Sequence, residues 1–401
     1  METLPTVLLK PGEADRVVAG HPWVYHSSIL RLTQPAEDGG VVQVKDHRQR
    51  FLGVGLYNSK SKIQVRMLAP ERVTIDRAFF NQRIRAALDL RRRHMPEATS
   101  FRVVNAESDL LSGLIVDKYE EVLVIQTAAR GMDNRKSLIV ESLQELFSPL
   151  AIVERNDASF RKFEGMTEST GILAGELSGP VPVHFHGLTL EADLKTGHKT
   201  GLYLDQQVNY GLVADLLARA GAKSVLDCFC FQGGFGLHAA RGGATQVLGI
   251  DQSAEAVAVA RRLAVLNGLG AQCSFEAVNV FDWFKASIHG SEKAAPTYDA
   301  VILDPPSFTR TRASVPDALR GYKEIHLRAL KLLRPGGTLA TFCCSHHVDA
   351  VTFMDVVLSA AYDSKRILLR VALYSQSPDH PVIPSIPETE YLKGYAFEVL
   401  R

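Results

Sequence analysis

The first 72 residues carry short runs of apolar and polar positions that predict β-strands. The clearest run extends from Ile63 to Leu68, where apolar and polar residues alternate as in a half-buried strand. Glycine, proline and asparagine separate the runs, and residues 20–23 (Gly-His-Pro-Trp) predict a turn that leads to an aromatic anchor. We therefore expect a small β-barrel or sandwich in residues 1–72.

Residues 73–185 combine helical and strand patterns. Asp76 can cap a helix over residues 76–95, because apolar residues recur on one face after it. These apolar residues are Phe80, Ile84, Ala87 and Leu88. Three β-rich runs, a helix near 134–147 and a fourth β-rich run follow, which predicts an α+β middle domain. Glycine, proline and histidine gather between Gly171 and Gly187, where we expect the boundary to the third domain.

From about residue 205 onward, helical segments alternate with short, strongly apolar runs. Such alternation predicts a parallel, doubly wound sheet, and hence an α/β domain over residues 186–401. Helices are expected over 207–220, 254–267 and 317–333, and strands over 224–227, 246–251, 273–279, 298–304 and 336–344. Ligands of this fold bind at the carboxyl ends of the strands, so we expect the chemistry there.

Composition narrows the classes of protein. The chain has 401 residues, of which 46% are apolar and 22% charged, so it is not a disordered, collagen-like or coiled-coil chain. Its five cysteines do not form a disulfide framework, which predicts a reducing, cytoplasmic setting. We expect no signal peptide, because the N-terminus carries a charge early and has no long apolar core, and no membrane span, because no run of about 18 apolar residues occurs.

Charge is nearly balanced over the whole chain but uneven along it. The net charge of +1 argues against a strongly basic nucleic-acid binder. Residues 1–72, however, hold ten Lys and Arg against seven Asp and Glu, and the helix predicted over 76–95 carries Arg83, Arg85 and Arg91–Arg93. A basic β-module is compatible with RNA binding, and equally with a solvated hairpin face. The residues expected to contact RNA are Lys45, Arg48, Lys60 and Lys62.

The strand that ends at Asp227 leads through a glycine-containing turn into a helix, an arrangement typical of nucleotide-binding sites. Glycines at 233, 234 and 236 let a ligand approach the backbone, and the helix N-terminus adds a positive dipole. The next strand ends at Asp251, whose carboxylate can accept both hydroxyls of a ribose. This pattern suits an adenosine-containing cofactor, either NAD or S-adenosylmethionine.

Two features favour S-adenosylmethionine. The glycine spacing of the NAD fingerprint is absent, and Asn279 or Asp282 after the third strand could bind the adenine amine. The fourth strand leads into an Asp-Pro-Pro-Ser-Phe turn, which could present a carboxylate, carbonyls and a stacking ring to a planar substrate; a rigid loop is the alternative. The expected cofactor contacts are Asp227, Phe229, Gly233, Asp251, Gln252, Asn279, Asp282 and Asp304, the expected substrate contacts are Pro305, Pro306 and Phe308, and no metal site is predicted.

Cys343 and Cys344 end the last strand of this series. Neighbouring residues of an extended strand face opposite sides, so only one of the two thiols can serve the site. A thiolate that adds to C6 of a pyrimidine makes C5 nucleophilic enough to take a methyl group, while Asp304 could hold or protonate N3. Cys344 is the candidate nucleophile, and the alternative is a small, buried apolar residue.

These segments resemble the bacterial 23S ribosomal-RNA methyltransferase I family, a group of S-adenosylmethionine-dependent RNA cytosine-C5 methyltransferases. GHPWVYHSSI resembles the opening of its RNA-binding PUA domain, and ESDLLSGLIVDKY and ERNDASFRKFEGM resemble its middle domain. Five further segments resemble the family's methyltransferase domain: TGHKTGLYLDQQ, VLDCFCFQGGFG, DPPSF, CCSHH and DHPVIPSIPETEYLKGY. The resemblance covers nearly the full length.

The resemblance implies a PUA β-barrel, an α+β middle domain and a Rossmann-like class I methyltransferase domain. Its catalytic pair matches Cys344 and Asp304, and its cofactor residues match Gly233, Asp251, Thr200, Tyr203 and Gln206. The chain departs from the family at Asn279, where an aspartate is common, and at Cys343, where a small residue is usual. The resemblance implies that the partner is large-subunit ribosomal RNA and that the protein does not bind a membrane. A homodimer is one possible assembly of the chain.

Two other functions stay open. An Asp-Pro-Pro-aromatic turn also resembles the motif used to methylate base amines, a reaction that needs no thiol. A non-catalytic RNA-binding protein that assists ribosome assembly could likewise retain a cofactor fold. Replacement of Cys344 distinguishes C5 methylation from amine methylation, because only C5 methylation needs the thiol. Cofactor binding without methyl transfer would indicate the non-catalytic protein.

Overall fold

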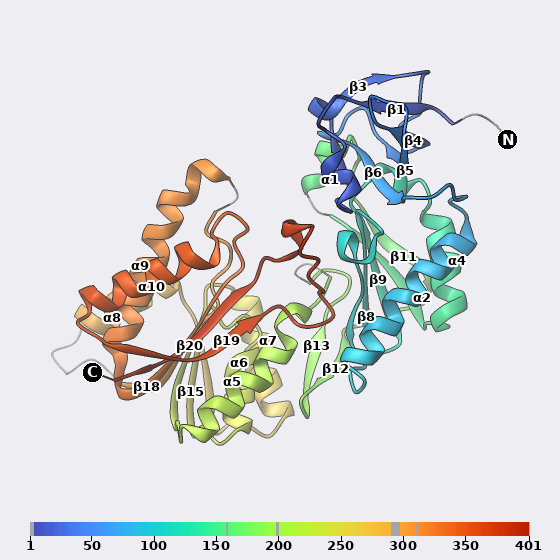
Figure 1. The fold of residues 1–401 in the computed structure, drawn as a ribbon. Coiled ribbons are helices and arrows are strands. Elements are labelled where there is room, and N and C mark those ends of the chain that lie inside the picture. Colours follow the sequence, from blue (N-terminus) through green and yellow to red (C-terminus); the bar gives the residue numbers. More distant parts are fainter. Residues whose placement is uncertain (1–3, 158, 198–199, 290–296, 310, 401) are drawn as a thin grey trace. The chain divides into compact units, whose positions relative to one another are not determined.

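The computed structural model describes residues 4–157, 159–197, 200–289, 297–309 and 311–400, which form two compact units (Figure 1). The first comprises Met1–His184, Glu191–Asp205 and Pro378–Thr389. The second comprises Phe185–Leu190, Gln206–Ser377 and Glu390–Arg401. The division proposed from the sequence separates residues 1–72 from 73–185, whereas the structure holds both within one unit.

The N-terminal part of the first unit is a six-stranded sheet in the order β2-β6-β5-β4-β1-β3. Its elements are β1 (Thr6–Leu9), α1 (Asp15–Val18), β2 (Trp23–Tyr25), β3 (Ile29–Leu32), β4 (Val41–Lys45), β5 (Phe51–Tyr57) and β6 (Ile63–Ala69). Val42, Val44 and Val65 lie at alternate positions of their strands and are fully buried in a shared core. The β-module expected in residues 1–72 is thereby confirmed.

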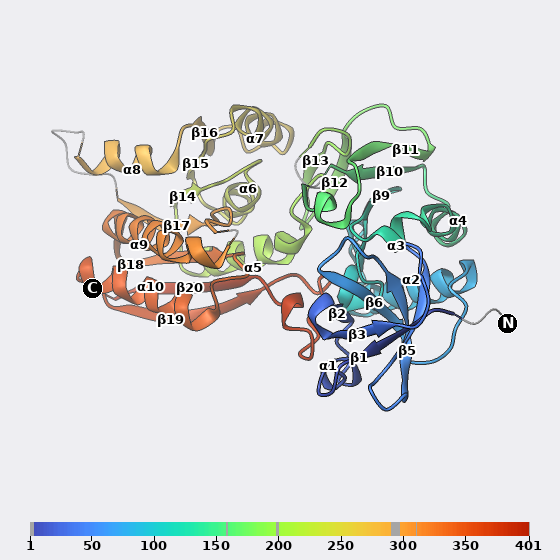
Figure 2. The ribbon, with the colours of Figure 1, turned by 90° about the horizontal axis from the view of Figure 1, so that it is seen from above.

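A five-stranded sheet in the order β11-β10-β9-β8-β7 forms the middle of the chain. Its elements are α2 (Arg77–His94), β7 (Phe101–Asn105), β8 (Leu114–Tyr119), β9 (Val122–Thr127), α3 (Arg130–Asp133), α4 (Lys136–Phe147), β10 (Ala151–Asn156) and β11 (Ser169–Gly175). One apolar cluster packs α2 and α4 against the sheet (Figures 1 and 2). Asp76 caps α2 as predicted, because its Oδ1 accepts a hydrogen bond of 3.0 Å from the backbone N–H of Phe79.

Arg91 does not belong to a basic surface, so the nucleic-acid role considered for it is wrong. Its side chain is buried, and its guanidinium donates hydrogen bonds to Asp109 Oδ2 (2.8 Å) and to the carbonyl oxygen of Asp379 (2.7 Å). The cause is helical spacing, since Arg91 lies one turn after Ala87 and Leu88 on the buried face of α2. The exposed arginines of this helix include Arg85, Arg92 and Arg93.

The second unit is built on a seven-stranded sheet in the order β16-β15-β14-β17-β18-β20-β19. Its strands are β14 (Ser224–Cys228), β15 (Gln246–Asp251), β16 (Cys273–Ala277), β17 (Tyr298–Leu303), β18 (Leu333–Cys343), β19 (Leu368–Ser375) and β20 (Lys393–Val399). One face is covered by α5 (Gln207–Arg219), α6 (Gly234–Arg241) and α7 (Ala254–Leu266), and the other by α8 (Val280–His289), α9 (Val315–Leu332) and α10 (Ala350–Asp363) (Figures 1 and 2). The expected doubly wound α/β architecture is confirmed.

Smaller elements complete the described chain. β12 (Val181–Phe185) and β13 (Leu188–Ala192) form a separate two-stranded sheet. Short 3-10 helices lie at His26–Ser28, Ala106–Asp109, Ser159–Glu164, Leu204–Gln206, Arg312–Ser314 and Pro387–Thr389.

The seven-stranded sheet is mixed, whereas the sequence predicted a parallel one. β14 to β18 run parallel, but β20 pairs antiparallel with β18 on one side and with β19 on the other. The pairing of β20 with β18 sets Lys393 opposite Cys343. Alternating apolar residues predict that a segment is a strand but not which strands it joins, so this insertion was not expected.

Candidate active site

Four of the predicted site residues lie at the carboxyl edge of the parallel strands. Asp227 lies in β14, Asp251 ends β15, Asp304 follows β17 and Cys344 follows β18. Since these strands are parallel and each pairs with the next in the series β15-β14-β17-β18, their carboxyl ends share one edge of the sheet. The glycine turn, the Asp-Pro-Pro turn and the thiol therefore belong to one edge.

The turn after β14 keeps its backbone in the left-handed region at three positions. Phe229, Phe231 and Gly233 have φ angles of 63°, 50° and 82°. A Cβ atom at Gly233 would also lie 2.8 Å from the ring of Phe275, so both the backbone and the available space require glycine there. Non-glycine residues in this region are strained and concentrate at functional sites, which supports a ligand-binding role for the turn.

Asp227 is a buried carboxyl with one unused oxygen. Its Oδ2 accepts a hydrogen bond of 2.8 Å from the backbone N–H of Gly236, while its Oδ1 has no hydrogen-bond partner among the described residues. Burial raises the pKa of Asp227 to about 8, and the charges of Asp304 and Asp251 act in the same direction. A cationic ligand group at Oδ1 would relieve both the missing hydrogen bond and the unfavourable charge.

The raised pKa of Asp227 predicts a fall in stability with pH. Between the unfolded value of 3.8 and the folded value of about 8, the folded chain binds one more proton, so stability is lost as pH rises. Replacement of Asp227 by asparagine should remove this loss, which we expect to reach about 2 kcal/mol between pH 6 and pH 8 in the unliganded protein. Urea unfolding at several pH values measures it.

Asp299 provides a matched control for that experiment. Although burial acts to raise its pKa, hydrogen bonds from the backbone of Lys223 and Ser224 keep the pKa of this carboxyl below its usual value. It is ionised in both states above pH 6, so Asp299→Asn should leave the pH slope unchanged. Equal slopes for Asp227→Asn and the unmodified protein would show that Asp227 is already ionised in the folded chain.

The carboxylate of Asp251 is held in place by the backbone. Its Oδ2 accepts a hydrogen bond of 3.0 Å from Phe231 N–H, and its Oδ1 accepts one of 2.8 Å from Ser253 N–H. Each oxygen keeps a second lone pair, and the residue is half-exposed, so it remains able to accept further hydrogen bonds. Gln252 beside it is exposed.

Asn279 and Asp282 lie at the start of α8 and not within a strand. Asn279 Oδ1 accepts a hydrogen bond of 2.9 Å from the backbone N–H of Phe281, so the amide oxygen is used to stabilise the first turn of the helix. Both Asn279 and Asp282 are exposed. Because the Asn279 Oδ1 atom is already used, the predicted contact with an adenine ring would be made by the Nδ2 group of Asn279 or by the Asp282 carboxylate.

Asp304 is oriented by a chain of side-chain amides. Gln206 Nε2 donates a hydrogen bond of 3.0 Å to Asp304 Oδ1, and Asn209 Nδ2 in turn donates one of 2.6 Å to Gln206 Oε1. Asn209 also binds the carbonyl oxygen of Ser375 at 3.0 Å. The predicted site residues Gln206 and Asp304 are therefore in contact, and Asn209 is an addition that the sequence did not indicate.

Thr200 and Tyr203 belong to the first unit. The Thr200 hydroxyl is buried and donates a hydrogen bond of 2.7 Å to Asp117 Oδ2, and it lies 3.0 Å from the hydroxyl of Tyr119. Tyr203 is half-buried. Their place beside a cofactor stays a prediction of the family resemblance.

The two neighbouring cysteines face different surroundings. Cys343 is fully buried in the core of the second unit, with its Sγ 3.4 Å from the hydroxyl of Tyr322. Cys344 is half-exposed, with its Sγ 3.9 Å from the carbonyl oxygen of Pro305 in the Asp-Pro-Pro turn. Of the two thiols, Cys344 is therefore the one beside that turn.

The other three cysteines are poor nucleophiles. Burial raises the pKa of the Cys228 and Cys230 thiols well above the usual range, and it raises that of Cys273 to about 12. Because the thiolate is the reactive form, these groups stay unreactive at neutral pH.

Ser345 connects the turn after β18 with the Asp-Pro-Pro-Ser-Phe turn. Its hydroxyl lies 2.9 Å from the hydroxyl of Ser307 in the Asp-Pro-Pro-Ser-Phe turn, and 2.9 Å from that of Tyr322 on α9. The serines occur in the predicted motifs, but their contact joins residues 38 positions apart and could not be read from the sequence.

Phe308 lies in an aromatic cluster. Its ring centroid is 4.6 Å from that of Tyr322, 5.9 Å from that of Phe281 and 6.2 Å from that of Phe229. Pro305 is buried and Pro306 is exposed. Phe308 is half-buried, so part of it stays open to the stacking role expected for it.

The basic residues expected to contact RNA lie at the end of β4 and in the connections before and after β5. Arg48, Lys60 and Lys62 are exposed and Lys45 is half-exposed, and within the described ranges none of their side chains forms an ion pair. Arg66, from the same basic segment, is used internally, since it pairs with Glu164 at 3.0 Å.

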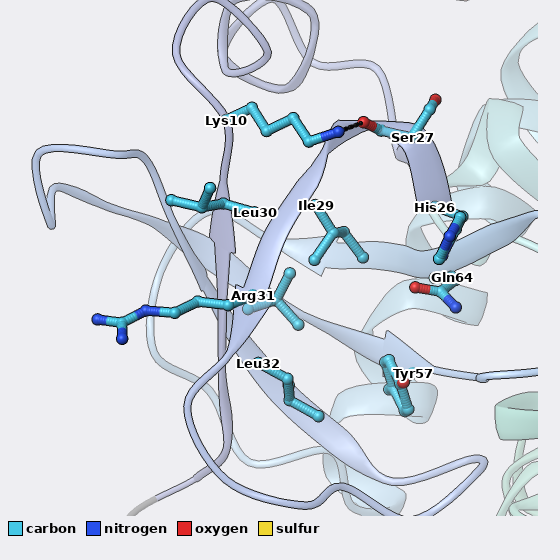
Figure 3. A pocket seen from close by; sticks show the side chains of 10 residues that line it. Lys10, His26, Ser27, Ile29, Leu30, Arg31, Leu32, Tyr57 and Gln64 are labelled. Carbon is cyan, nitrogen blue, oxygen red and sulfur yellow. Dashed lines mark hydrogen bonds between the residues drawn. The ribbon is translucent and has the colours of Figure 1, made fainter.

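A hollow of about 500 Å³ lies on the N-terminal sheet (Figure 3). None of those four residues lines it, although the backbone N–H of His26 in its wall donates a hydrogen bond of 3.0 Å to the carbonyl oxygen of Lys62. Lys10, His26, Arg31, Tyr57 and Gln64 supply its polar lining, and Lys10 donates a hydrogen bond to the carbonyl oxygen of Ser27. The hollow belongs to the first unit, whereas the Asp227, Asp304 and Cys344 edge belongs to the second. We base the candidate cofactor site on the chemistry of the strand ends and not on this hollow.

The described residues show no candidate membrane span and no candidate metal site. Within them, no helix is long and apolar enough to cross a membrane, and no group of three or more His, Cys, Asp or Glu side chains could hold a metal ion.

Family models match two parts of the chain. A model of a PUA-like domain matches residues 7–70, which contain the six-stranded sheet. A model of an S-adenosylmethionine-dependent methyltransferase matches residues 165–385, which contain Asp227, Asp251, Asp304 and Cys344.

Relatives match nearly the whole chain. The protein named ribosomal RNA large subunit methyltransferase I from Shewanella amazonensis is 38% identical over 98% of this chain and 99% of its own length. Its namesake from Vibrio vulnificus is 36% identical over 98% and 99%. Among solved structures, a SAM-dependent methyltransferase of Streptococcus mutans has a TM-score of 0.81 at 21% identity, and SMU.776, a methyltransferase complexed with SAH, has 0.83 at 22%; each covers 98% of this chain and 100% of its own.

Proposed function

Because the chain belongs to the ribosomal RNA large subunit methyltransferase I family, we propose that it transfers a methyl group from S-adenosylmethionine to C5 of a cytosine in 23S ribosomal RNA. The family supports the cofactor and the class of substrate. The observation that carries the choice of C5 is the half-exposed Cys344 thiol beside the Asp-Pro-Pro turn. Methylation of a base nitrogen would not use this thiol. The substrate also suits the expected cytoplasmic setting.

The residues at the strand ends fit the cofactor. S-adenosylmethionine supplies an electrophilic methyl group on a positively charged sulfur. Asp227 offers a buried carboxyl oxygen that lacks a partner among the described residues, which suits the cofactor's ammonium group. Asp251 offers lone pairs to the ribose hydroxyls, and Gly233 allows the left-handed backbone of the turn and its close packing against Phe275. The further contacts that we propose are Phe229, Gln252, Asn279 and Asp282.

In the proposed reaction, Cys344 provides covalent assistance. Its thiolate forms a bond from Sγ to C6 of the cytosine, and the electrons of the C5–C6 double bond move toward C5 and N3. Asp304 holds or protonates N3 as charge builds there, and C5 accepts the methyl group. The bond between the methyl group and the cofactor sulfur breaks in this transfer, which leaves SAH. A water molecule then accepts the C5 proton, the C5–C6 double bond re-forms as the thiolate leaves C6, and N3 returns any proton that it took from Asp304. A target base in structured RNA must leave its stack to reach the thiol.

Methyl transfer to defined RNA tests the function. The full chain is incubated with methyl-labelled S-adenosylmethionine and free 23S RNA, large subunits or assembled ribosomes, and the labelled nucleotide is mapped and identified. We expect 5-methylcytidine at a discrete position. A label on an exocyclic nitrogen would establish the alternative reaction, and cofactor binding without transfer to any of these substrates would indicate a non-catalytic assembly factor.

The basic residues of the N-terminal sheet predict a modest salt dependence of RNA binding. If Lys60 and Lys62 each neutralise one phosphate, replacement of both by alanine should lower the slope of log affinity against log salt by about 1.5. The double variant Lys10→Ala with Arg31→Ala, in the hollow of Figure 3, is the matched control and should leave the slope unchanged. If the slope falls only in the Lys10→Ala and Arg31→Ala variant, the residues of the hollow and not Lys60 and Lys62 contact the phosphates.

A further inference from the structure

Lys393 lies against the strand that carries the two cysteines. It is the first residue of β20 and pairs in register with Cys343. Its Nζ donates a hydrogen bond of 2.8 Å to the carbonyl oxygen of Ser345, the residue directly after Cys344. The ammonium group is therefore fixed on the turn that carries the exposed thiol, although Lys393 is 49 positions further along the chain.

We propose that Lys393 is a positioning residue for methyl transfer, whose ammonium group anchors the Cys344 turn and supplies a positive charge that favours the Cys344 thiolate. The inference rests on the proposed function, in which Cys344 attacks the base. It extends beyond that function because it names the group that prepares the thiol. A positive charge close to a cysteine increases the fraction of reactive thiolate at neutral pH.

Several ionisable groups surround this turn, and most of them oppose a new negative charge. They are Asp304 after β17, Tyr322 on α9, Cys343 on β18, His346 and His347 in the turn, Asp349 before α10, and Glu390 before β20. Burial raises the pKa of the Tyr322 phenol, so this group is neutral. The carboxylates disfavour a thiolate, and Lys393 carries the opposite charge.

Lys393 itself is suited to remain charged. Burial lowers the pKa of its ammonium group, whereas Asp349, Glu390 and the two cysteines act to raise it. The side chain is only half-buried and its Nζ has a carbonyl acceptor. Large losses of lysine basicity occur in fully buried groups, so we expect Lys393 to carry its proton at neutral pH.

The charge of Lys393 can be separated from its role as an anchor. The turn has two further attachments, since the Ser345 hydroxyl contacts both Ser307 and Tyr322. A neutral residue of similar length at position 393 should therefore leave the turn in place and remove the charge. Lys393→Met makes this change, while Lys393→Arg retains the charge.

Alkylation of Cys344 measures the thiolate directly. The full chain is treated with iodoacetamide between pH 6 and pH 9.5, and fragment ions separate Cys344 from Cys343. In Lys393→Met we expect alkylation of Cys344 at pH 7 to be about tenfold slower and to recover at high pH, since one pKa unit corresponds to tenfold. Lys393→Arg and the exposed control Lys331→Met should match the unmodified protein.

Methyl transfer should follow the same pattern. In Lys393→Met, kcat at pH 7 should fall about tenfold and recover as pH rises, with KM for RNA unchanged. A merely structural role would lower activity at every pH and would not shift the profile.

An alkylation profile of Lys393→Met that superimposes on that of the unmodified protein, with SAH binding intact, would overturn the inference. If Lys393→Met fails to fold, Lys393→Gln is measured in the same way, and an unshifted profile is equally decisive. The proposed function fails separately, through full activity of Cys344→Ala, because alkylation reports the thiol whether or not the thiol is catalytic.

Discussion

Replacement of Cys344 by alanine is expected to reduce methyl transfer by roughly 10⁴-fold or more, because in the proposed reaction this thiol forms the bond to C6 that activates C5. Cofactor binding should change little, since the residues proposed for the cofactor lie at or after the ends of β14, β15 and β16, whereas Cys344 follows β18. Initial rates with 23S RNA and calorimetric binding of SAH measure the two effects. Cys344→Ser should be similarly inactive, because a hydroxyl is hardly ionised at neutral pH.

Cys343→Ala is the matched control at the neighbouring position. Cys343 is fully buried against Tyr322, so its loss should cost about 1 kcal/mol of stability and leave most of the activity. Full activity of Cys344→Ala together with an inactive, folded Cys343→Ala would reassign the nucleophile. Full activity of both would remove the covalent mechanism and favour methylation of a nitrogen.

An RNA that carries 5-fluorocytosine at the mapped position provides a direct test of the adduct. After methyl transfer the fluorine cannot leave C5 as a proton does, so the bond between C6 and Cys344 should persist. We expect a stable protein–RNA complex whose cross-linked peptide contains residue 344, and no complex with Cys344→Ala.

Local patterns were sufficient to predict most of the second unit. β14, β15, β17 and the second half of β18 are short, largely apolar runs that alternate with helical segments, and Asp227, Asp251, Asp304 and Cys344 lie at or after the ends of these runs. Parallel strands present their carboxyl ends at one edge of the sheet, so the sequence alone predicts that these four residues lie near one another. Helical spacing also places Arg91 on the buried face of α2, whereas its positive charge alone favours an exposed position.

Contacts between distant segments could not be predicted in this way. β20 enters the sheet between β18 and β19, and only that insertion brings Lys393 to the Cys344 turn. The segment Pro378–Thr389 likewise joins the first unit, where Asp379 accepts hydrogen bonds from the Arg91 guanidinium and from the backbone of Arg102. Such pairings depend on complementary charge and space in three dimensions, which hydrophobic periodicity does not encode.

Asp304→Asn is expected to lower kcat by about 10²- to 10⁴-fold, the range of a lost general acid, while KM for RNA and the affinity for SAH change little. Asparagine can still hold N3 through a hydrogen bond but cannot give it a proton. The size of the loss therefore distinguishes protonation of N3 from simple orientation of the base. Single-turnover rates across pH measure it without interference from product release.

The fall in kcat of Gln206→Ala provides the reference for that of Asp304→Asn. Gln206 Nε2 donates the 3.0 Å hydrogen bond that orients the Asp304 carboxyl, so this variant measures the effect of orientation alone. Removal of this bond leaves the proton available but frees the carboxyl to turn, so we expect a loss of about tenfold. If Asp304→Asn loses no more than Gln206→Ala, Asp304 orients the base and another group must balance the charge on N3. If its loss is much larger and confined to kcat, proton transfer from Asp304 is part of the rate-limiting step, and the Asp-Pro-Pro turn has a chemical role beyond its rigid shape.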